Sequence, residues 1–197
     1  MIDAAPVSPP DLPADPPSVL IRDAEPEDAG FIASHYNHYV LTTAVSMETE
    51  AVDSAEIARR MADVRDGGLP WIVLEEHGRL LGWAYATKWR ARPGYRHAVE
   101  TTVYLAPGQG ARGYGTRLYG ALLERLRGRF HCAIGGIALP NPASVALHER
   151  LGFRQVAHFA EVGHKFGAWI DVGYWQRMLD AAPADQPAAE PQPPISG

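Results

Sequence analysis

The sequence predicts a mixed fold of the α/β (α+β) class, with one central sheet of about seven strands flanked by about four helices. Two observations predict it. Short apolar stretches typical of strands and longer segments with helical spacing of apolar residues follow the order β-α-α-β-β-β-α-β-α-β-β. A glycine-rich turn, APGQGARGYG at residues 106–115, joins the fourth strand of this order to the third helix.

The first strand and the first two helices are predicted from local patterns. We expect a short strand at Val19 to Arg22 and a helix that begins at Pro26, where apolar residues recur at helical spacing. The second helix is expected to begin with Ser54 as its N-cap, to carry Glu56 in its first turn, and to end at Arg65 before two glycines.

The middle of the chain is predicted to form three strands and a helix. Residues 71–89 divide into two strands joined by a hairpin turn at His77-Gly78, and HAVETTVYL at 97–105 forms the third. The helix after the glycine-rich turn has one apolar face, made of Leu118, Tyr119, Leu122, Leu123 and Leu126.

The C-terminal part is predicted to hold three strands and one helix. HCAIGGIAL at 131–139 is typical of a buried strand. Asn141 is expected to cap the next helix, with Pro142 at its first position, and the helix is expected to end at Leu151-Gly152. Strands at 153–162 and 169–178 complete the sheet.

One domain is expected between two tails. Residues 1–17 and 181–197 are rich in Pro and Ala and lack the apolar side chains needed to offset the entropy of ordering. We expect both to be disordered and residues 18–180 to form a single domain. No secretory signal is expected, because the N-terminus has no basic region followed by an apolar run. No membrane span is expected, because no apolar run approaches about 20 residues. A lone cysteine, Cys132, fits a reducing compartment, and the cytoplasm is the expected location.

The charge distribution favours a small anionic ligand over nucleic acid. The formal net charge is −5, which argues against nucleic acid as a general partner. Between Lys88 and Arg129, however, nine basic residues accompany two acidic ones. This stretch is either an exposed, solvated basic face or the surroundings of an anion, and its position around the glycine-rich turn favours the anion.

The glycine-rich turn contains the G-x-G-x-x-G spacing at Gly108, Gly110 and Gly113. A dinucleotide site would also need an acidic residue at the end of the next strand, and HCAIGGIALPN has none. A P-loop would need Gly-Lys-Ser/Thr, which is missing as well. Small residues before a helix N-terminus still let backbone N–H groups approach a phosphate, so the turn suits a pyrophosphate.

At this point the sequence resembles a known superfamily. The turn and its helix, followed by Asn141, His148 and Leu151-Gly152-Phe153, resemble the Gcn5-related N-acetyltransferases (GNAT). Four further stretches are similar to phosphinothricin N-acetyltransferases: YNHYV, KWRARPGYRHAVETTVYL, ALPNPASVALHERLGF and KFGAWIDVGYWQ. The similarity extends from about Ile21 to Arg177.

The resemblance implies a GNAT fold and an acetyl-CoA-dependent enzyme, often a homodimer, with no metal. It implies acetylation of the α-amino group of phosphinothricin, methionine sulfone, methionine sulfoximine or an ordinary amino acid. Herbicide resistance, detoxification and acetylation of a natural amino acid stay open as its role. The residues expected to bind acetyl-CoA are Val103, Tyr104, Leu105, Ala111, Arg112, Gly113, Tyr114, Gly115, Thr116 and Asn141. Gly110 and Ala111 depart from the usual pattern of the turn.

The catalytic candidates are Glu100 and His148. Transfer to an α-ammonium group needs a base, and Glu100 lies in an apolar strand where burial would raise the pKa of its carboxyl. The alternative is a carboxylate on a wet face or one paired with Arg96. His148 takes the position of a tyrosine that many relatives use to protonate the thiolate, so it is an acid or a proton relay. The alternative is a helical histidine that only packs or caps.

Substrate recognition is assigned to the loop before the Glu100 strand. A guanidinium can grip a carboxylate or phosphinate through paired hydrogen bonds, which favours Arg92 and, less strongly, Arg90. The full set of substrate-binding candidates is Arg92, Pro93, Gly94, Tyr95, Asn37 and His38. His35 and His38 have a helical spacing compatible with a metal, but no further ligand accompanies them.

Two functions of different classes follow. The first is a small-molecule N-acetyltransferase, and the second is a non-catalytic acyl-CoA sensor on the same fold. Retention of both Glu100 and His148 favours the enzyme, because a sensor needs no proton path. Acetylation of a protein substrate is a weaker third possibility, since the loop at 92–95 suits a small anionic amino acid.

Overall fold

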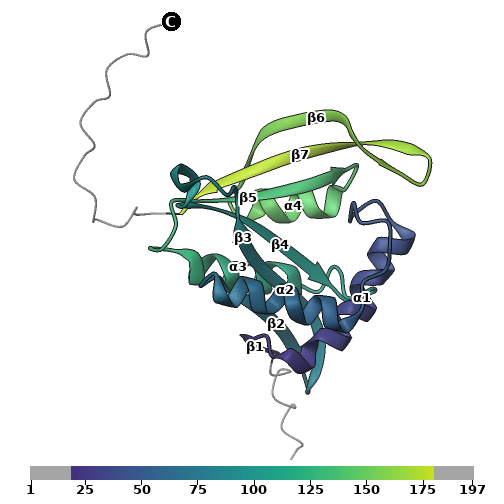
Figure 1. Cartoon of the computed structure of the whole chain (residues 1–197), viewed down its shortest axis with the longest axis vertical. Helices are drawn as coiled ribbons and strands as arrows, with labels where there is room; N and C mark the ends of the chain where they lie inside the picture. The colour runs from purple at the N-terminus through teal and green to yellow at the C-terminus, as the bar shows by residue number, and fades with distance from the viewer. Residues whose placement is uncertain (1–18, 180–197) are drawn as a thin grey trace, which may run out of the picture.

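The computed structural model describes residues 19–179, which form one seven-stranded sheet with helices on both faces (Figure 1). The two tails predicted to be disordered lie outside the described residues. The strands are β1 (Val19–Asp23), β2 (Trp71–Glu76), β3 (Arg79–Lys88), β4 (Ala98–Leu105), β5 (Cys132–Leu139), β6 (Arg154–Lys165) and β7 (Ala168–Met178). The α-helices are α1 (Ala29–Thr42), α2 (Ser54–Asp66), α3 (Tyr114–Leu126) and α4 (Pro142–Arg150). The order of elements predicted from the sequence is confirmed.

The strands lie side by side in the order β1-β2-β3-β4-β5-β7-β6. Neighbouring strands are antiparallel except β4 and β5, which are parallel. The turn between β2 and β3 uses His77 and Gly78, whose φ angles are 52° and 74°. Two consecutive residues with positive φ give the turn a twist that matches the hairpin, and this explains the glycine.

The helices cover opposite faces of the sheet. Trp83 of β3 and Tyr104 of β4 pack against α1, where their rings meet Phe31 and Tyr36. The preceding residue of β3, Gly82, instead faces the α3 side, because a Cβ there would meet Leu118. Since successive strand residues point to opposite faces, α1 and α3 lie on opposite sides.

The core forms where the predicted apolar face of α3 meets the sheet. All five residues of that face are at most 1% exposed. Burying a leucine side chain is worth about 2 kcal/mol relative to leaving it exposed, so this face anchors the helix firmly. The anchored helix also fixes its own N-terminus, which begins directly after the glycine-rich turn.

Three local expectations are corrected by the structure. Asp53, not Ser54, caps α2: its Oδ1 accepts a hydrogen bond from the Glu56 N–H at 2.8 Å. The turn at Pro26 is a short 3₁₀ segment, Pro26–Asp28, and α1 begins at Ala29. The last hairpin is longer than the pattern indicated, because β6 continues to Lys165 and β7 starts at Ala168.

Candidate active site

The site begins where β4 and β5 separate. The two strands pair at three positions, from Ala98–Cys132 to Glu100–Ile134, and no further pairing joins them in the described part of the chain. Figure 1 shows them diverging toward α1. At the start of the gap, Thr101 Oγ1 lies 3.2 Å from the Ile134 carbonyl oxygen. Backbone groups of β4 beyond this point are therefore available to a ligand.

Two glycines of β5 leave room for the side chains that lie next to the gap. A Cβ at Gly135 would collide with the imidazole of His148, and one at Gly136 would lie 3.2 Å from the Tyr174 ring and 3.5 Å from Glu100 Oε1. The two glycines face opposite sides of the sheet, because they are successive strand residues. His148 and Glu100 therefore approach β5 from opposite faces.

A cleft of about 610 Å³ leads away from this gap. Its walls are the end of β4, the glycine-rich turn, the first turn of α3 and one side of α4, with Tyr39 of α1 and Val45 at its edge. Eight of the predicted coenzyme residues line it: Val103, Tyr104, Leu105, Ala111, Gly113, Gly115, Thr116 and Asn141.

The turn exposes backbone donors at the start of α3. Gly113 precedes the helix with a φ of 79°, a left-handed conformation that glycine adopts without strain. The first helical hydrogen bond runs from Arg117 N–H to the Gly113 carbonyl, so the N–H groups of residues 114–116 precede the helical ladder. Such a helix N-terminus attracts phosphate.

Two predicted coenzyme residues turn away from the cleft. The Tyr114 hydroxyl donates to Glu76 Oε1 at 2.8 Å, and the side chain is 5% exposed. The Arg112 guanidinium stacks over the Tyr114 ring at 5.0 Å and lies 4.0 Å from Glu76. Their side chains therefore support the glycine-rich turn on the side away from the cleft.

Glu100 is half-buried on the α1 side of β4. Burial raises the pKa of its carboxyl above the ordinary value, and the positive charge of Arg90 partly opposes the rise. Among residues 19–179 its carboxylate has no hydrogen bond or ion pair within the protein, and Arg96 instead donates to the Pro93 carbonyl. A carboxylate with a raised pKa and no protein partner is a suitable proton acceptor.

His148 is buried on the other face, at 4% exposure. Its Nδ1 lies 2.8 Å from the Ser144 carbonyl oxygen, and its Nε2 lies 3.1 Å from the Tyr119 hydroxyl. Burial lowers the pKa of the imidazole, while the bond to Ser144 opposes the decrease. A carbonyl accepts only, so Nδ1 carries the proton and the neutral ring accepts from Tyr119 through Nε2.

The chain from His148 continues to β4. The Tyr119 hydroxyl is 2.7 Å from Thr101 Oγ1, and burial raises the pKa of Tyr119 far above the usual range. When Tyr119 donates to His148, its oxygen can accept from Thr101, whose single proton is shared between Tyr119 and the Ile134 carbonyl. Three buried polar groups thus form one chain, and both of its ends, His148 and Thr101, line the gap.

The predicted substrate loop is exposed. Arg92 to Tyr95 lie at a 3₁₀ turn, and Tyr95 is 45% exposed. Arg90 lines an apolar pocket of about 350 Å³, together with Tyr174 and Phe159. Its guanidinium stacks over Trp89 at 4.2 Å, and its positive charge lowers the pKa of Glu100. Arg90, ranked below Arg92 by the sequence, is therefore the arginine whose charge acts on the candidate base.

Asn37 and His38 have different environments. The Asn37 amide donates to the Val52 carbonyl at 2.8 Å and accepts from the Val52 N–H at 2.9 Å. It therefore holds the connection to α2. His38 is exposed on α1, and its ring lies edge-on to Tyr39. In residues 19–179 no group of three or more His, Cys, Asp or Glu side chains is arranged to hold a metal.

Comparison with known proteins identifies the family. The profile described as an acetyltransferase (GNAT) domain matches residues 21–173. The phosphinothricin N-acetyltransferase of Streptomyces coelicolor is 41% identical over 167 residues, which cover 82% of this chain and 96% of that protein. The chain belongs to the phosphinothricin N-acetyltransferase family of GNAT enzymes.

Two other relatives support the assignment. This acetyltransferase is 37% identical over 169 residues to the L-methionine sulfoximine/L-methionine sulfone acetyltransferase of Salmonella typhimurium, covering 84% of this chain and 98% of that protein. An acetyltransferase of Salmonella typhimurium, solved with its cofactor acetyl-CoA, matches with a TM-score of 0.81 and 36% identity, covering 85% and 99% of the two chains. The predicted fold and the acyltransferase class are confirmed.

Several cleft residues of this acetyltransferase escaped the sequence analysis. The Tyr39 hydroxyl donates to the Leu105 carbonyl at 2.8 Å and ties α1 to the end of β4. Arg150, in the last turn of α4, brings a positive charge to the cleft. The YNHYV stretch was the available signal for Tyr39, whereas Arg150 could be found only once α4 was placed beside the cleft. In the described residues no helix has the length and apolarity needed to cross a membrane.

Proposed function

We propose that this acetyltransferase transfers the acetyl group of acetyl-CoA directly to the α-amino group of a small amino-acid-like acceptor. Phosphinothricin, methionine sulfone and methionine sulfoximine are the acceptors we favour, by similarity to the relatives named above. One observation carries the proposal: the half-buried Glu100 carboxylate lies where the pairing of β4 and β5 ends, and the cleft lined by the glycine-rich turn begins a few residues farther along β4.

The cleft residues fit acetyl-CoA. Acetyl-CoA supplies the acetyl group as a thioester, and the transfer forms an amide bond and releases the coenzyme as a thiol. The N–H groups at the start of α3 suit its pyrophosphate, and Arg150 adds positive charge. The edge of β4 at residues 103–105, which β5 does not pair, suits the amides of the pantetheine arm, with the Leu105 carbonyl already bonded to Tyr39. One of its N–H groups would polarise the thioester oxygen.

Glu100 is the proposed general base. An α-ammonium group must lose a proton before its nitrogen attacks the thioester carbon, and the raised pKa of Glu100 brings the carboxylate closer to that task. Arg90, beside it, is the proposed partner of the acceptor carboxylate, together with the predicted set at 92–95. The apolar pocket next to Arg90 would receive the acceptor side chain.

His148 is the proposed proton relay for the departing thiolate. It lines the gap, and its neutral ring is linked through Tyr119 to Thr101. The acceptor ammonium loses two protons when it becomes an amide, so one can go to Glu100 and the other to the thiolate through His148, whose ring Ser144 and Tyr119 hold in place. We also propose that the enzyme is a cytoplasmic homodimer, assembled through the exposed apolar side chains of the β6–β7 hairpin.

Acetyl-CoA-dependent thiol release with a panel of amines tests the function. The panel holds phosphinothricin, methionine sulfone, methionine sulfoximine, common amino acids and a lysine peptide. We expect turnover on at least one of the amino-acid analogues, and Glu100→Gln should lower its kcat by about 100-fold or more. Binding of acetyl-CoA without turnover on any amine would favour the sensor. Preference for the peptide would favour a protein substrate.

A further inference from the structure

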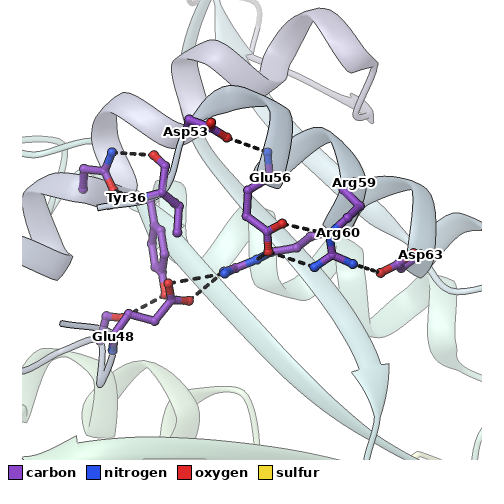
Figure 2. A network of polar contacts seen from close by, with 10 residues as sticks. Tyr36, Glu48, Asp53, Glu56, Arg59, Arg60 and Asp63 are labelled. Carbon is purple, nitrogen blue, oxygen red and sulfur yellow. Dashed lines mark hydrogen bonds and ion pairs between the residues drawn. The ribbon is translucent and has the colours of Figure 1, made fainter. Parts of the chain in front are cut away.

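An ion pair lies between α2 and the segment that connects it to α1, residues 43–53. Arg60 Nη1 donates to Glu48 Oε1 at 2.6 Å, and its Nε donates to Glu56 Oε1 at 2.7 Å. Figure 2 shows Glu48 reaching toward Arg60 from the segment, with Tyr36 of α1 on its other side. The Tyr36 hydroxyl donates to Glu48 Oε1 at 2.9 Å. Glu48 is therefore bound by both helices at once.

The orientation of this network follows from the chemistry of Tyr36. Burial raises the pKa of Tyr36 to about 12, so its hydroxyl keeps its proton at neutral pH. With that proton donated to Glu48, the Tyr36 oxygen accepts from the Ser46 hydroxyl, 2.8 Å away. Ser46 Oγ in turn accepts from the Glu48 N–H at 3.2 Å. Residues 46 and 48 are thus fixed by a consistent set of donors and acceptors.

The network has a partly buried end and an exposed end. The Arg60 and Glu48 side chains are 33% and 34% exposed, whereas Arg59 and Asp63, which pair with each other on α2, are 60% and 65% exposed. Figure 2 shows the second pair pointing along the helix, away from the segment. Exposed pairs contribute little, so the two ends are expected to differ in effect.

The other side of the segment contacts the β6–β7 hairpin. Lys165 is 3% exposed, and its Nζ donates to the Ser46 carbonyl at 2.5 Å. Burial lowers the pKa of Lys165, and the negative charge of Glu48 opposes the decrease. Met47 packs on Gly163, where a Cβ would lie 2.7 Å from its sulfur. The segment therefore bridges the helices and the last hairpin.

Segment 43–53 borders the proposed reaction centre. Val45 lines both the coenzyme cleft and the gap between β4 and β5. Tyr36 packs edge-on to Tyr104, which lies on the same face of β4 as Glu100. Burial chiefly raises the pKa of Tyr85, but the charges of Arg60, Glu100 and Glu48 also act on it. The charges of Glu48 and Arg60 therefore act on the same Tyr85 hydroxyl as the charge of Glu100, the proposed base.

We propose that Glu48 and Arg60 are positioning residues that hold segment 43–53 over the acceptor side of the reaction centre. Neither side chain is among those that line the coenzyme cleft, the gap or the apolar pocket, so they act through Ser46, Met47 and Val45. The inference rests on the proposed function for its kinetic part. Loss of the pair should release the segment, whose Met47 packs on Gly163 next to the pocket-lining Val162, so that the acceptor is bound and oriented poorly. Val45 is the one residue of the segment among those that line the coenzyme cleft, so coenzyme binding should change less.

The test compares Glu48→Gln, Arg60→Gln and their double variant with Asp63→Asn, a matched control at the exposed end of the network. We expect each single variant to raise the acceptor KM about tenfold, while the Kd of CoA, measured by calorimetry, changes by less than about threefold. Hydrogen exchange of residues 43–53 should accelerate in these variants. The double variant should lose no more than the worse single one, because both remove the same interaction. Asp63→Asn should match the wild type.

Several results would overturn the proposal: an unchanged acceptor KM with unchanged exchange, additive losses in the double variant, or a CoA Kd that rises as much as the acceptor KM. The exchange measurement needs no turnover. If the wild type acetylated no amine, the proposed function would fail, and exchange of segment 43–53 would still decide whether Glu48 and Arg60 hold it.

Discussion

At the scale of single residues, the two catalytic candidates differ in how the protein surrounds them. Glu100 has a raised pKa and no protein partner in the described chain, which leaves its carboxylate available to a proton from the acceptor. His148 has both ring nitrogens engaged, by Ser144 and Tyr119. The first arrangement suits direct contact with the acceptor, and the second holds a neutral imidazole in one orientation beside the gap.

The pH dependence of kcat/KM should follow the ionisation of the Glu100 carboxyl. As a base it works deprotonated, so kcat/KM is expected to rise with pH through a pKa above the ordinary carboxyl value. Arg90 lowers that pKa by its positive charge, so Arg90→Gln should move this rise to higher pH. Arg96→Gln is the matched control from the same loop and should leave the rise in place. A profile that shifts with Arg96 and not with Arg90 would contradict the assignment.

At the scale of elements, the coenzyme cleft depends on how a strand, a turn and a helix meet. The apolar face of α3 fixes the helix, and the left-handed Gly113 lets the chain enter it with its first N–H groups exposed. Side chains behind the turn, Arg112 and Tyr114, hold it through Glu76. The site is therefore made of backbone, which explains how the departures at Gly110 and Ala111 are compatible with a cleft lined by both residues.

Gly113→Asp tests this backbone site. A Cβ at Gly113 meets no atom within 4 Å, so a side chain has room, although the φ of 79° strains any residue other than glycine. A carboxylate there would repel the pyrophosphate, and the Kd of CoA should rise more than about tenfold. Gly113→Asn carries the same strain without the charge and should raise it much less. Equal losses in the two variants, measured by calorimetry, would assign the effect to strain alone.

Local patterns located the elements but not their ends or their distant partners. Asp53 and Ser54 are both good caps, and only the extended backbone at Asp53 decides between them. The end of β6 gave little signal, because most of its residues are exposed and apolar alternation is lost. The role of Arg90 relative to Arg92 depends on how the loop after β3 folds, and the hydrogen-bond partner of His148 Nε2 is Tyr119, 29 residues away in the sequence. These properties depend on tertiary packing, which the spacing of residues in the sequence does not determine.

At the scale of the whole molecule, the last hairpin connects the acceptor side to an exposed apolar surface. Figure 1 shows β6 and β7 extending beyond the rest of the sheet, at the edge opposite β1. The exposed fraction is 50% or more for six of its large apolar side chains: Val156, Phe159, Val162, Phe166, Trp169 and Met178. Burying these apolar side chains against another protein surface would lower the free energy, because it removes them from water. We therefore expect this surface to pair with a second copy of the chain.

Assembly is therefore expected to respond to the hairpin and not to the opposite edge. Trp169→Glu places a charge in the middle of the proposed interface and should convert a dimer into a monomer, as measured by sedimentation at micromolar concentration. Leu20→Glu, at a residue of β1 that is 50% exposed, is the matched control and should remain dimeric. Val156, Phe159 and Val162 also line the pocket beside Arg90, so the monomeric variant should show a raised acceptor KM. A wild type that sediments as a monomer would refute the interface, and the apolar hairpin would then need another partner.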